Sequence, residues 1–163
     1  MRSHRSMCAS AVLAGILLGG LAGNASRAQA FDVVALNQLR TAKTVPLPAD
    51  LTDADLHTAD LQAANLYLAN LGGANLSGAV LGGANLEGAF LEEANLRGAD
   101  LRGANLRRAY LRKANLTDAN LTGADLRDAN LTGANLTGAT VGNTPMEGAD
   151  LTGTIMPDGS QHP

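Results

Sequence analysis

The side chains of this sequence that could do acid–base or metal chemistry do not form a catalytic arrangement. Beyond residue 30 the histidines are His57 and His162, and neither has a nucleophilic partner at a spacing that catalysis uses. His57 lies beside Asp55 and Asp60, which is more typical of a surface histidine than of a metal ligand. No glycine-rich phosphate loop opens a helical pattern. We therefore expect no catalytic residue, no metal site and no cofactor, and we do not expect an enzyme.

The remaining candidates are side chains suited to binding a partner. Six of them stand out by their spacing: Phe90, Tyr110, Arg97, Arg102, Arg107 and Arg112. The arginines recur every five residues, and the two aromatic residues lie four such intervals apart. Both spacings are multiples of a five-residue repeat, so that repeat must set the positions of these side chains in space.

The five-residue repeat runs almost without interruption from residue 50 to residue 153. Each unit has alanine, then asparagine or aspartate, then leucine, then two variable residues. With the leucine numbered i, there are 21 centres from Leu51 to Leu151, and only Val141 and Met146 replace the leucine. Position i−2 is alanine except at Thr144, position i−1 is Asn or Asp in 16 units, and position i+2 is Gly in 11. Such regularity predicts one repeat architecture rather than a conventional globular core.

A period of five fits neither an α-helix nor a flat strand. On a helix, successive leucines would step around by about 140° and would cover every face. On a flat strand, an odd period would swap inward and outward positions at each repeat. The pattern works if the chain turns once per unit, with i−2 and i pointing inward and glycine at the bend. Four right-angle turns would close a square coil that stacks at about 4.8 Å on the next, although a triangular coil is also allowed by period and residue size alone.

The units resemble the consensus A(D/N)LXX of the pentapeptide-repeat family. Ala64-Asn65-Leu66, Ala84-Asn85-Leu86 and Ala99-Asp100-Leu101 are typical matches. The resemblance implies an all-β solenoid, a right-handed quadrilateral β-helix, with about five coils of four units each over residues 49–153. Solenoid ends expose unpaired edges. We expect residues 31–48 to form a short helical cap and linker at the amino end, and residues 154–163 to form a loose tail that partly blunts the other edge.

Residues 1–30 have the features of a secretory signal peptide. Arg2 and Arg5 precede an apolar run, and Ala28-Gln29-Ala30 fits the cleavage pattern. The run is shorter than the roughly 20 residues that span a bilayer, which favours cleavage after Ala30 over retention as an anchor. Cleavage would remove Cys8, the one cysteine, and would leave no transmembrane span. It would also leave a formal charge of −6, which does not favour nucleic-acid binding.

The segment before the first repeat is similar to the leader of exported bacterial pentapeptide-repeat proteins, including cyanobacterial lumenal ones. The resemblance implies a protein of the periplasm, or of the thylakoid lumen in a cyanobacterium. Those proteins often carry C-x-x-C just before the first repeat, whereas Pro46 and Ala49 occupy the corresponding positions here. A redox or disulfide role attached to that motif therefore cannot be carried over.

Coils of four units would place every fourth unit in the same vertical column. Phe90 and Tyr110 should then stack on one face, between Asn70 and Asn130, in a contact worth about 1 kcal/mol. Two interpretations are open. The pair could be a local stabilising contact, or it could be an exposed patch for a partner or a dimer.

The arginines from Arg97 to Arg112 would lie on four successive faces and encircle one coil as a basic belt. We expect vertical ion pairs, each worth roughly 0–1 kcal/mol, between Glu87 and Arg107, Glu92 and Arg112, Glu93 and Lys113, and Arg108 and Asp128. Arg97 and Arg102 have Ser77 and Gly82 in their columns, so they are expected to be the freer pair. A solvated belt balanced by carboxylates and a site for an anionic partner both fit this pattern.

These observations favour an exported, non-enzymatic scaffold that binds a protein or other envelope partner, not identified by the sequence, through its outer faces. A second possibility comes from the family, in which some members mimic DNA and protect gyrase. The export signal and the arginine belt argue against it. A third is a binder of anionic envelope components through the belt from Arg97 to Arg112. Homodimerisation is also possible, since a solenoid end is an open edge.

Overall fold

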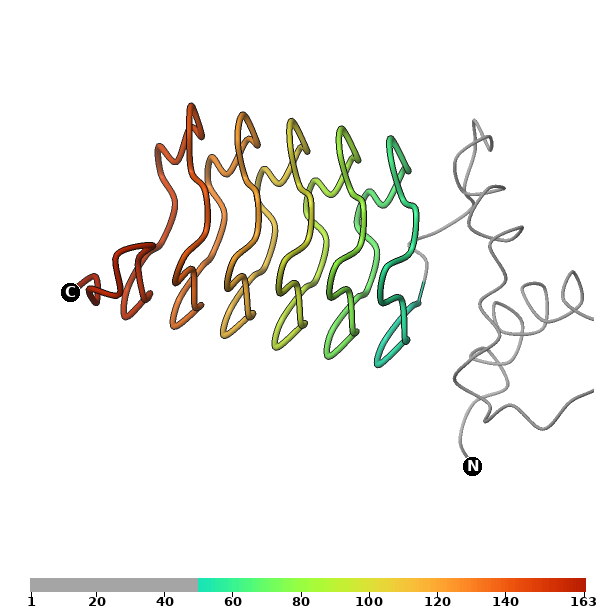
Figure 1. Cartoon of the computed structure of the whole chain (residues 1–163), viewed down its shortest axis with the longest axis horizontal. Coiled ribbons are helices and arrows are strands. Elements are labelled where there is room, and N and C mark those ends of the chain that lie inside the picture. The colour runs from blue at the N-terminus through green and yellow to red at the C-terminus, as the bar shows by residue number, and fades with distance from the viewer. Residues whose placement is uncertain (1–49) are drawn as a thin grey trace, which may run out of the picture.

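The chain winds into coils that stack along one axis (Figure 1). The structure is a computed structural model and describes residues 50–163. The expected signal peptide (1–30) and the expected cap and linker (31–48) lie outside the described residues. Within residues 50–163, no helix is long and apolar enough to cross a membrane.

Single bridged residues, rather than long strands, hold the coils together. With one exception, at Asp125, parallel bridges join each unit to the fourth unit after it, from Asp50 with Asn70 to Asn135 with Ile155, so one coil contains four units. Each bridge involves position i−1, which occurs once in every unit, so each coil has four walls. The square cross-section is confirmed, and the triangular alternative does not apply.

Backbone hydrogen bonds between coils follow the same register in every wall. The leucine N–H donates to the i−1 carbonyl of the next coil, as from Leu91 to Tyr110 at 2.7 Å. The i−1 N–H donates to the alanine carbonyl of the preceding coil, as from Tyr110 to Ala89 at 2.9 Å. Most backbone polar groups of a coil are thus paired with the neighbouring coils, although no strand within residues 50–163 is longer than one bridged residue.

A tight turn separates each wall from the next. The alanine N–H donates to the preceding leucine carbonyl, as from Ala94 to Leu91 at 3.1 Å, and the residue at i+2 has a positive φ. This combination is typical of a type II turn, which explains the frequent glycine at i+2. Arg108 and Lys113 adopt the same conformation, each with φ of 56°. Glycine is therefore favoured at the corner but is not required.

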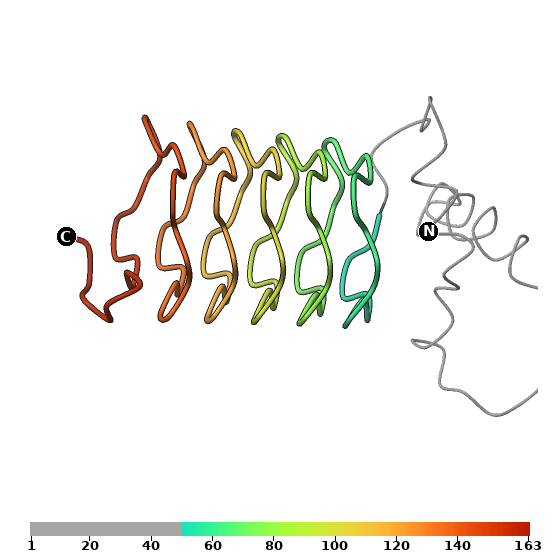
Figure 2. The same cartoon turned by 45° about the horizontal axis from the view of Figure 1, so that its top comes forward.

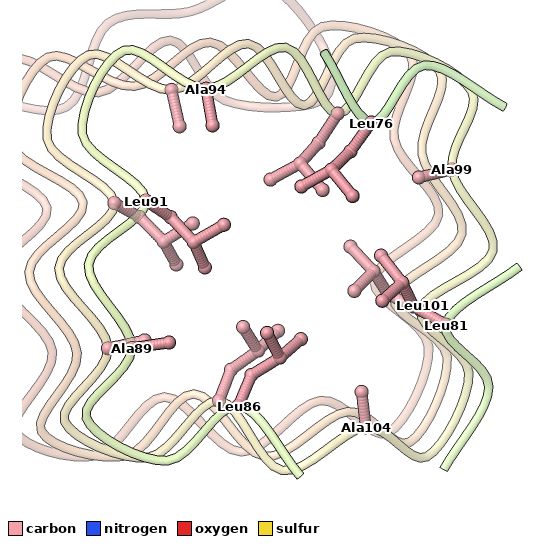
Figure 3. Packing of buried hydrophobic residues seen from close by; sticks show 14 of the residues in the cluster. Leu76, Leu81, Leu86, Ala89, Leu91, Ala94, Ala99, Leu101 and Ala104 are labelled. Atoms are coloured by element: carbon pink, nitrogen blue, oxygen red, sulfur yellow. The ribbon is translucent and has the colours of Figure 1, made fainter. Parts of the chain in front are cut away.

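The bore of the solenoid contains leucine and alanine. From Ala64 to Leu136 every i−2 and i side chain is at most 1% exposed. Figure 3 shows leucines pointing inward from the four walls, with smaller alanines beside them. The labelled leucines are Leu76, Leu81, Leu86, Leu91 and Leu101. Burying each leucine is worth roughly 2 kcal/mol, so the inside supplies most of the stability.

The last coil departs from the consensus and still keeps its register. Pro145 has no N–H, and the bridge that would join it to Asp125 is missing, but the Leu126 N–H still donates to the Pro145 carbonyl at 2.9 Å. Thr144 and Thr154 replace the inward alanine. Their hydroxyls donate to the carbonyls of Leu121 and Leu131, each at 2.7 Å, which satisfies the added polar group inside the coil.

The carboxyl-terminal tail is not loose, contrary to the sequence-based expectation. It turns back at Gly159 and pairs with the final coil through an antiparallel bridge between Ile155 and Gln161. The His162 N–H donates to Thr154 at 2.8 Å, and the Gly153 N–H donates to His162 at 3.0 Å. The tail lies at the end of the stack away from residue 50 (Figure 2). It therefore covers part of the final edge.

Candidate interaction surface

The i−1 side chain has a structural role that was not evident from the sequence pattern alone. In most units its Oδ1 accepts a hydrogen bond from the backbone N–H at i+1, as from Arg97 to Asn95 at 3.3 Å. This contact caps the corner, because the i+1 N–H has no carbonyl partner in the next coil. Asn and Asp fit the position since their short side chains reach back to their own backbone.

Asparagines on two walls also form vertical ladders. The Asn95 amide donates to Asn75 at 3.2 Å and the Asn115 amide donates to Asn95 at 3.3 Å. We call the residues of this wall the asparagine column: Asp55, Asn75, Asn95, Asn115 and Asn135. Each of Asn75, Asn95 and Asn115 contributes both a corner cap and a link between coils. This column therefore shows both structural roles of an asparagine at position i−1.

The wall just before it along the chain lacks the capping side chain at two successive coils. We call its i−1 residues the aromatic column: Asp50, Asn70, Phe90, Tyr110, Asn130 and Asp150. The Phe90 and Tyr110 rings stack with centroids 5.0 Å apart and planes 5° from parallel, which confirms the predicted contact. The side chains remain 39% and 44% exposed.

The aromatic pair gives up two corner caps. Among the described residues, no side chain accepts from the N–H of Glu92 or Arg112, because neither ring carries an acceptor within reach. A capping hydrogen bond is worth about 1 kcal/mol, and a ring stack contributes a similar amount. One stack therefore does not make up for two lost caps, and stability alone is a weak reason for these residues.

Charged residues flank the two rings in rows of opposite sign. The charged residues at the corners on either side of Phe90 are all carboxylates, which we call the acidic row: Glu87, Glu92 and Glu93. The corners on either side of Tyr110, one coil on, carry only cations, which we call the basic row: Arg107, Arg108, Arg112 and Lys113. Together with the aromatic column, these rows form what we call the aromatic face.

The predicted vertical ion pairs form only in part. Lys113 Nζ lies 3.4 Å from Glu93 Oε1, as expected. Arg107 instead contacts Asp128 at 4.0 Å, and Glu87 accepts from the Asn105 amide at 3.2 Å. The predicted pairs of Glu87 with Arg107, Glu92 with Arg112, and Arg108 with Asp128 are wrong. Arg107 reaches Asp128 diagonally, so neither the Glu87–Arg107 pair nor the Arg108–Asp128 pair forms.

The expectation that Arg97 and Arg102 are the freer arginines is also wrong. Arg102 makes two hydrogen bonds to Asp100 in its own unit, at 2.8 and 2.6 Å. Arg97 lies 3.7 Å from Asp118 in the next coil. Among residues 50–163, it is Arg108 and Arg112 that have no ion-pair partner. The free cations of the belt therefore lie beside Tyr110.

Two arginines at i+1 are held by the i−1 carboxylate of their own unit. The hydrogen bond from Arg127 Nε to Asp125 Oδ1, at 2.9 Å, lowers the pKa of Asp125 to about 2. The corresponding bond from Arg102 lowers the pKa of Asp100. In both units the carboxylate caps the corner and fixes the arginine, so these cations are less available to a partner.

Two further exposed apolar residues lie at the corner that leads into the aromatic column. Tyr67 is 51% exposed and Leu68 is 37% exposed. Leu68 lies over Gly88, because a Cβ at Gly88 would come within 2.7 Å of Leu68 Cδ2. These residues were missed from the sequence. They could have been found from their position four units before Glu87 and Gly88, because the other residues in these two corner columns are charged or glycine.

The candidates for acid–base and metal chemistry stay apart. His57 contacts Asp55, with Nδ1 and Oδ1 3.0 Å apart, and this hydrogen bond lowers the pKa of Asp55. His162 lies in the tail, next to the chain end. In the part of the chain that the structure describes, no three His, Cys, Asp or Glu side chains are close enough to hold a metal ion.

The repeat matches a known family model over most of the solenoid. The model for pentapeptide repeats matches residues 49–78, 74–112 and 114–153 in eight copies. The chain belongs to the pentapeptide-repeat family. Members of this family form right-handed quadrilateral β-helices, in agreement with the four walls and four-unit coils described above. No curated protein is a significant match to this chain.

Three solved pentapeptide-repeat structures from cyanobacteria are similar to this chain. HetL of Nostoc sp. strain PCC 7120, involved in heterocyst differentiation regulation, is 37% identical with a TM-score of 0.53, over 71% of this chain and 65% of HetL. Rfr23 of Cyanothece 51142 is 44% identical with a TM-score of 0.54, over 58% and 62% of the two chains. The Nostoc protein alr5209 is 36% identical with a TM-score of 0.55, over 72% and 93%. This chain thus matches just under two thirds of the length of HetL and of Rfr23, so their roles do not transfer directly.

Proposed function

We propose that this pentapeptide-repeat protein is an exported, non-enzymatic interaction module that binds a protein partner through its aromatic face. The observation that carries the proposal is the aromatic pair itself. Phe90 and Tyr110 replace the capping residue at two successive coils of one wall, and both rings stay partly exposed. Aromatic residues surrounded by charge are typical of the centre and rim of a protein interface.

The geometry of the rings favours a protein over a sugar. Because Phe90 and Tyr110 stack in parallel, each ring covers one face of the other. Their outer ring faces point along the column toward Asn70 and Asn130, so solvent meets mainly ring edges. A sugar ring would need an open aromatic face on which to lie.

The charges favour a partner of mixed charge over a polyanion. The acidic row would repel an anionic surface that the basic row attracts, since the two rows are one coil apart. Arg97 and Arg102, which were expected to be the freer cations of the belt, are held by Asp118 and Asp100. The basic row also interrupts the continuous acidic surface that a DNA mimic needs. Both alternatives are therefore less well supported than a protein partner.

Export remains part of the proposal and depends on residues 1–30. Fractionation of cells that produce the full chain should place the processed protein in the periplasm, or in the thylakoid lumen of a cyanobacterium, with Phe31 as its first residue. An uncleaved protein in the cytoplasm would contradict this part.

Affinity capture from an envelope extract tests the interaction. The bait would be the wild-type chain, the double variant Phe90→Asn/Tyr110→Asn, or Val80→Asn as the matched control. Val80 is also an exposed apolar residue at i−1, but it lies on another wall. We expect the double variant to lose partners that the Val80 variant keeps. Identical capture by all three baits would contradict a role for the aromatic face.

A further inference from the structure

The aromatic face is complementary to itself. The acidic row of three carboxylates surrounds Phe90, and the basic row of four cations surrounds Tyr110 on the adjacent coil. Neither row contains a charge of the other sign. A surface with this layout matches a second copy of itself when the order of the two rows is reversed.

We propose that the protein forms an antiparallel homodimer through this face. The two-fold axis lies in the interface, parallel to the wall, and crosses it level with the gap between Phe90 and Tyr110, at right angles to the solenoid axis. This proposal rests on the proposed function, because it names a second copy of the chain as the partner. An isologous interface of this kind is the commonest arrangement of homodimers.

The charge layout selects one of the two symmetric ways to bring the walls together. With the solenoids antiparallel, the acidic row of each copy faces the basic row of the other, and Phe90 faces Tyr110 of the second copy. With the solenoids parallel, Phe90 would face Phe90, and each row would face a row of its own sign. Like charges across an interface disfavour the parallel arrangement.

The charges left unpaired in one copy are those that the dimer would pair. Glu92 and Arg112 occupy the same corner column on adjacent coils, yet no ion pair joins them within the described residues. In the antiparallel dimer Glu92 faces Arg112 of the second copy, and symmetry repeats this contact. The Glu93–Lys113 pair is 66% and 56% exposed, so its side chains can also turn toward the second copy.

The complementary area is confined to the middle of the wall. The neighbouring i−1 residues, Asn70 and Asn130, are uncharged, and beyond them Asp50 would face Asp150 of the second copy. A flat patch of a few coils falls short of the roughly 1,600 Å² that a standard interface buries. We therefore expect a weak dimer whose formation depends on concentration and salt, because exposed charge pairs are screened at high ionic strength.

Charge reversal at one pair tests the proposal. Sedimentation equilibrium of the purified full chain should show a monomer–dimer equilibrium at low salt. Glu92→Arg and Arg112→Glu, each alone, should raise the dissociation constant at least tenfold, because each places like charges together twice. An equimolar mixture of the two variants should associate again, because one carries two cations at these positions and the other two carboxylates.

Two matched controls keep the test specific. Arg97→Glu and Asp118→Arg make the same changes in charge at a corner that does not border the aromatic face, and they should leave the dissociation constant within twofold of wild type. A chain that stays monomeric at all accessible concentrations would overturn the homodimer, and so would a mixture that fails to associate. If capture of another protein still depended on Phe90 and Tyr110 in that case, the interaction function would stand without the dimer.

Discussion

The asparagine column and the aromatic column share one backbone and differ in what their side chains do. Asn95 bridges to Asn115, and Phe90 bridges to Tyr110, in the same parallel register. The asparagines cap their corners and link the coils, whereas the rings stack on each other and leave two corners uncapped. The backbone therefore tolerates either choice. The comparison separates the capping role of position i−1, which stabilises the solenoid, from the positions at which another side chain can serve recognition.

The inside of the solenoid should not distinguish the two walls. Leu91, behind the aromatic column, and Leu96, behind the asparagine column, are both fully buried. Truncation of either to alanine should reduce the free energy of unfolding by about 3 kcal/mol, because each leaves a cavity in the bore. Chemical denaturation measures both. A Leu91 variant that is much less destabilised than the Leu96 variant would mean that the walls differ inside as well as outside.

Transfer of an aromatic residue to the asparagine column should be harmful. Asn95→Phe would remove the cap on Arg97 and the links to Asn75 and Asn115, at a cost of about 1–2 kcal/mol in the free energy of unfolding. Asn95→Asp keeps the acceptor for the cap and serves as the control, with a smaller loss. If Asn95→Phe were as stable as wild type, the capping rule would be wrong.

A smaller effect concerns a carboxylate at i−1 in place of an amide. The Arg127 hydrogen bond lowers the pKa of Asp125 to about 2, below the usual value of about 3.9 for an unfolded chain. Its stabilising contribution is present above pH 4 and is lost as the pH falls toward 2. Asp125→Asn should therefore make the melting temperature fall less steeply between pH 4 and 2. The corresponding change in the free energy of unfolding should be less than about 1 kcal/mol, because the pair is partly exposed. Arg127→Gln should flatten it similarly, whereas wild-type steepness in both variants would contradict the assignment.

The sequence predicted those features that follow from the period. The inward leucine and alanine follow from the period of five. The coil of four units was implied by the family resemblance, since the period also allowed a triangular coil, and the Phe90–Tyr110 stack follows from that coil. The side-chain contacts within one unit were not predictable in this way. Arg102 pairs with Asp100 rather than with the next coil because the turn brings i−1 and i+1 together. The tail has no repeat, so its return onto Ile155 had no signal in the pattern.

The most direct test of the account is the thermal stability of Phe90→Asn/Tyr110→Asn at a concentration where wild type is monomeric. The double variant restores the consensus residue to the aromatic column, so it regains two corner caps in exchange for one ring stack. We predict a melting temperature within about 5 °C of wild type, which corresponds to about 1 kcal/mol in a domain of this size. A fall of more than about 10 °C would show that the aromatic pair is kept for stability, and would contradict the claim that this face is reserved for recognition.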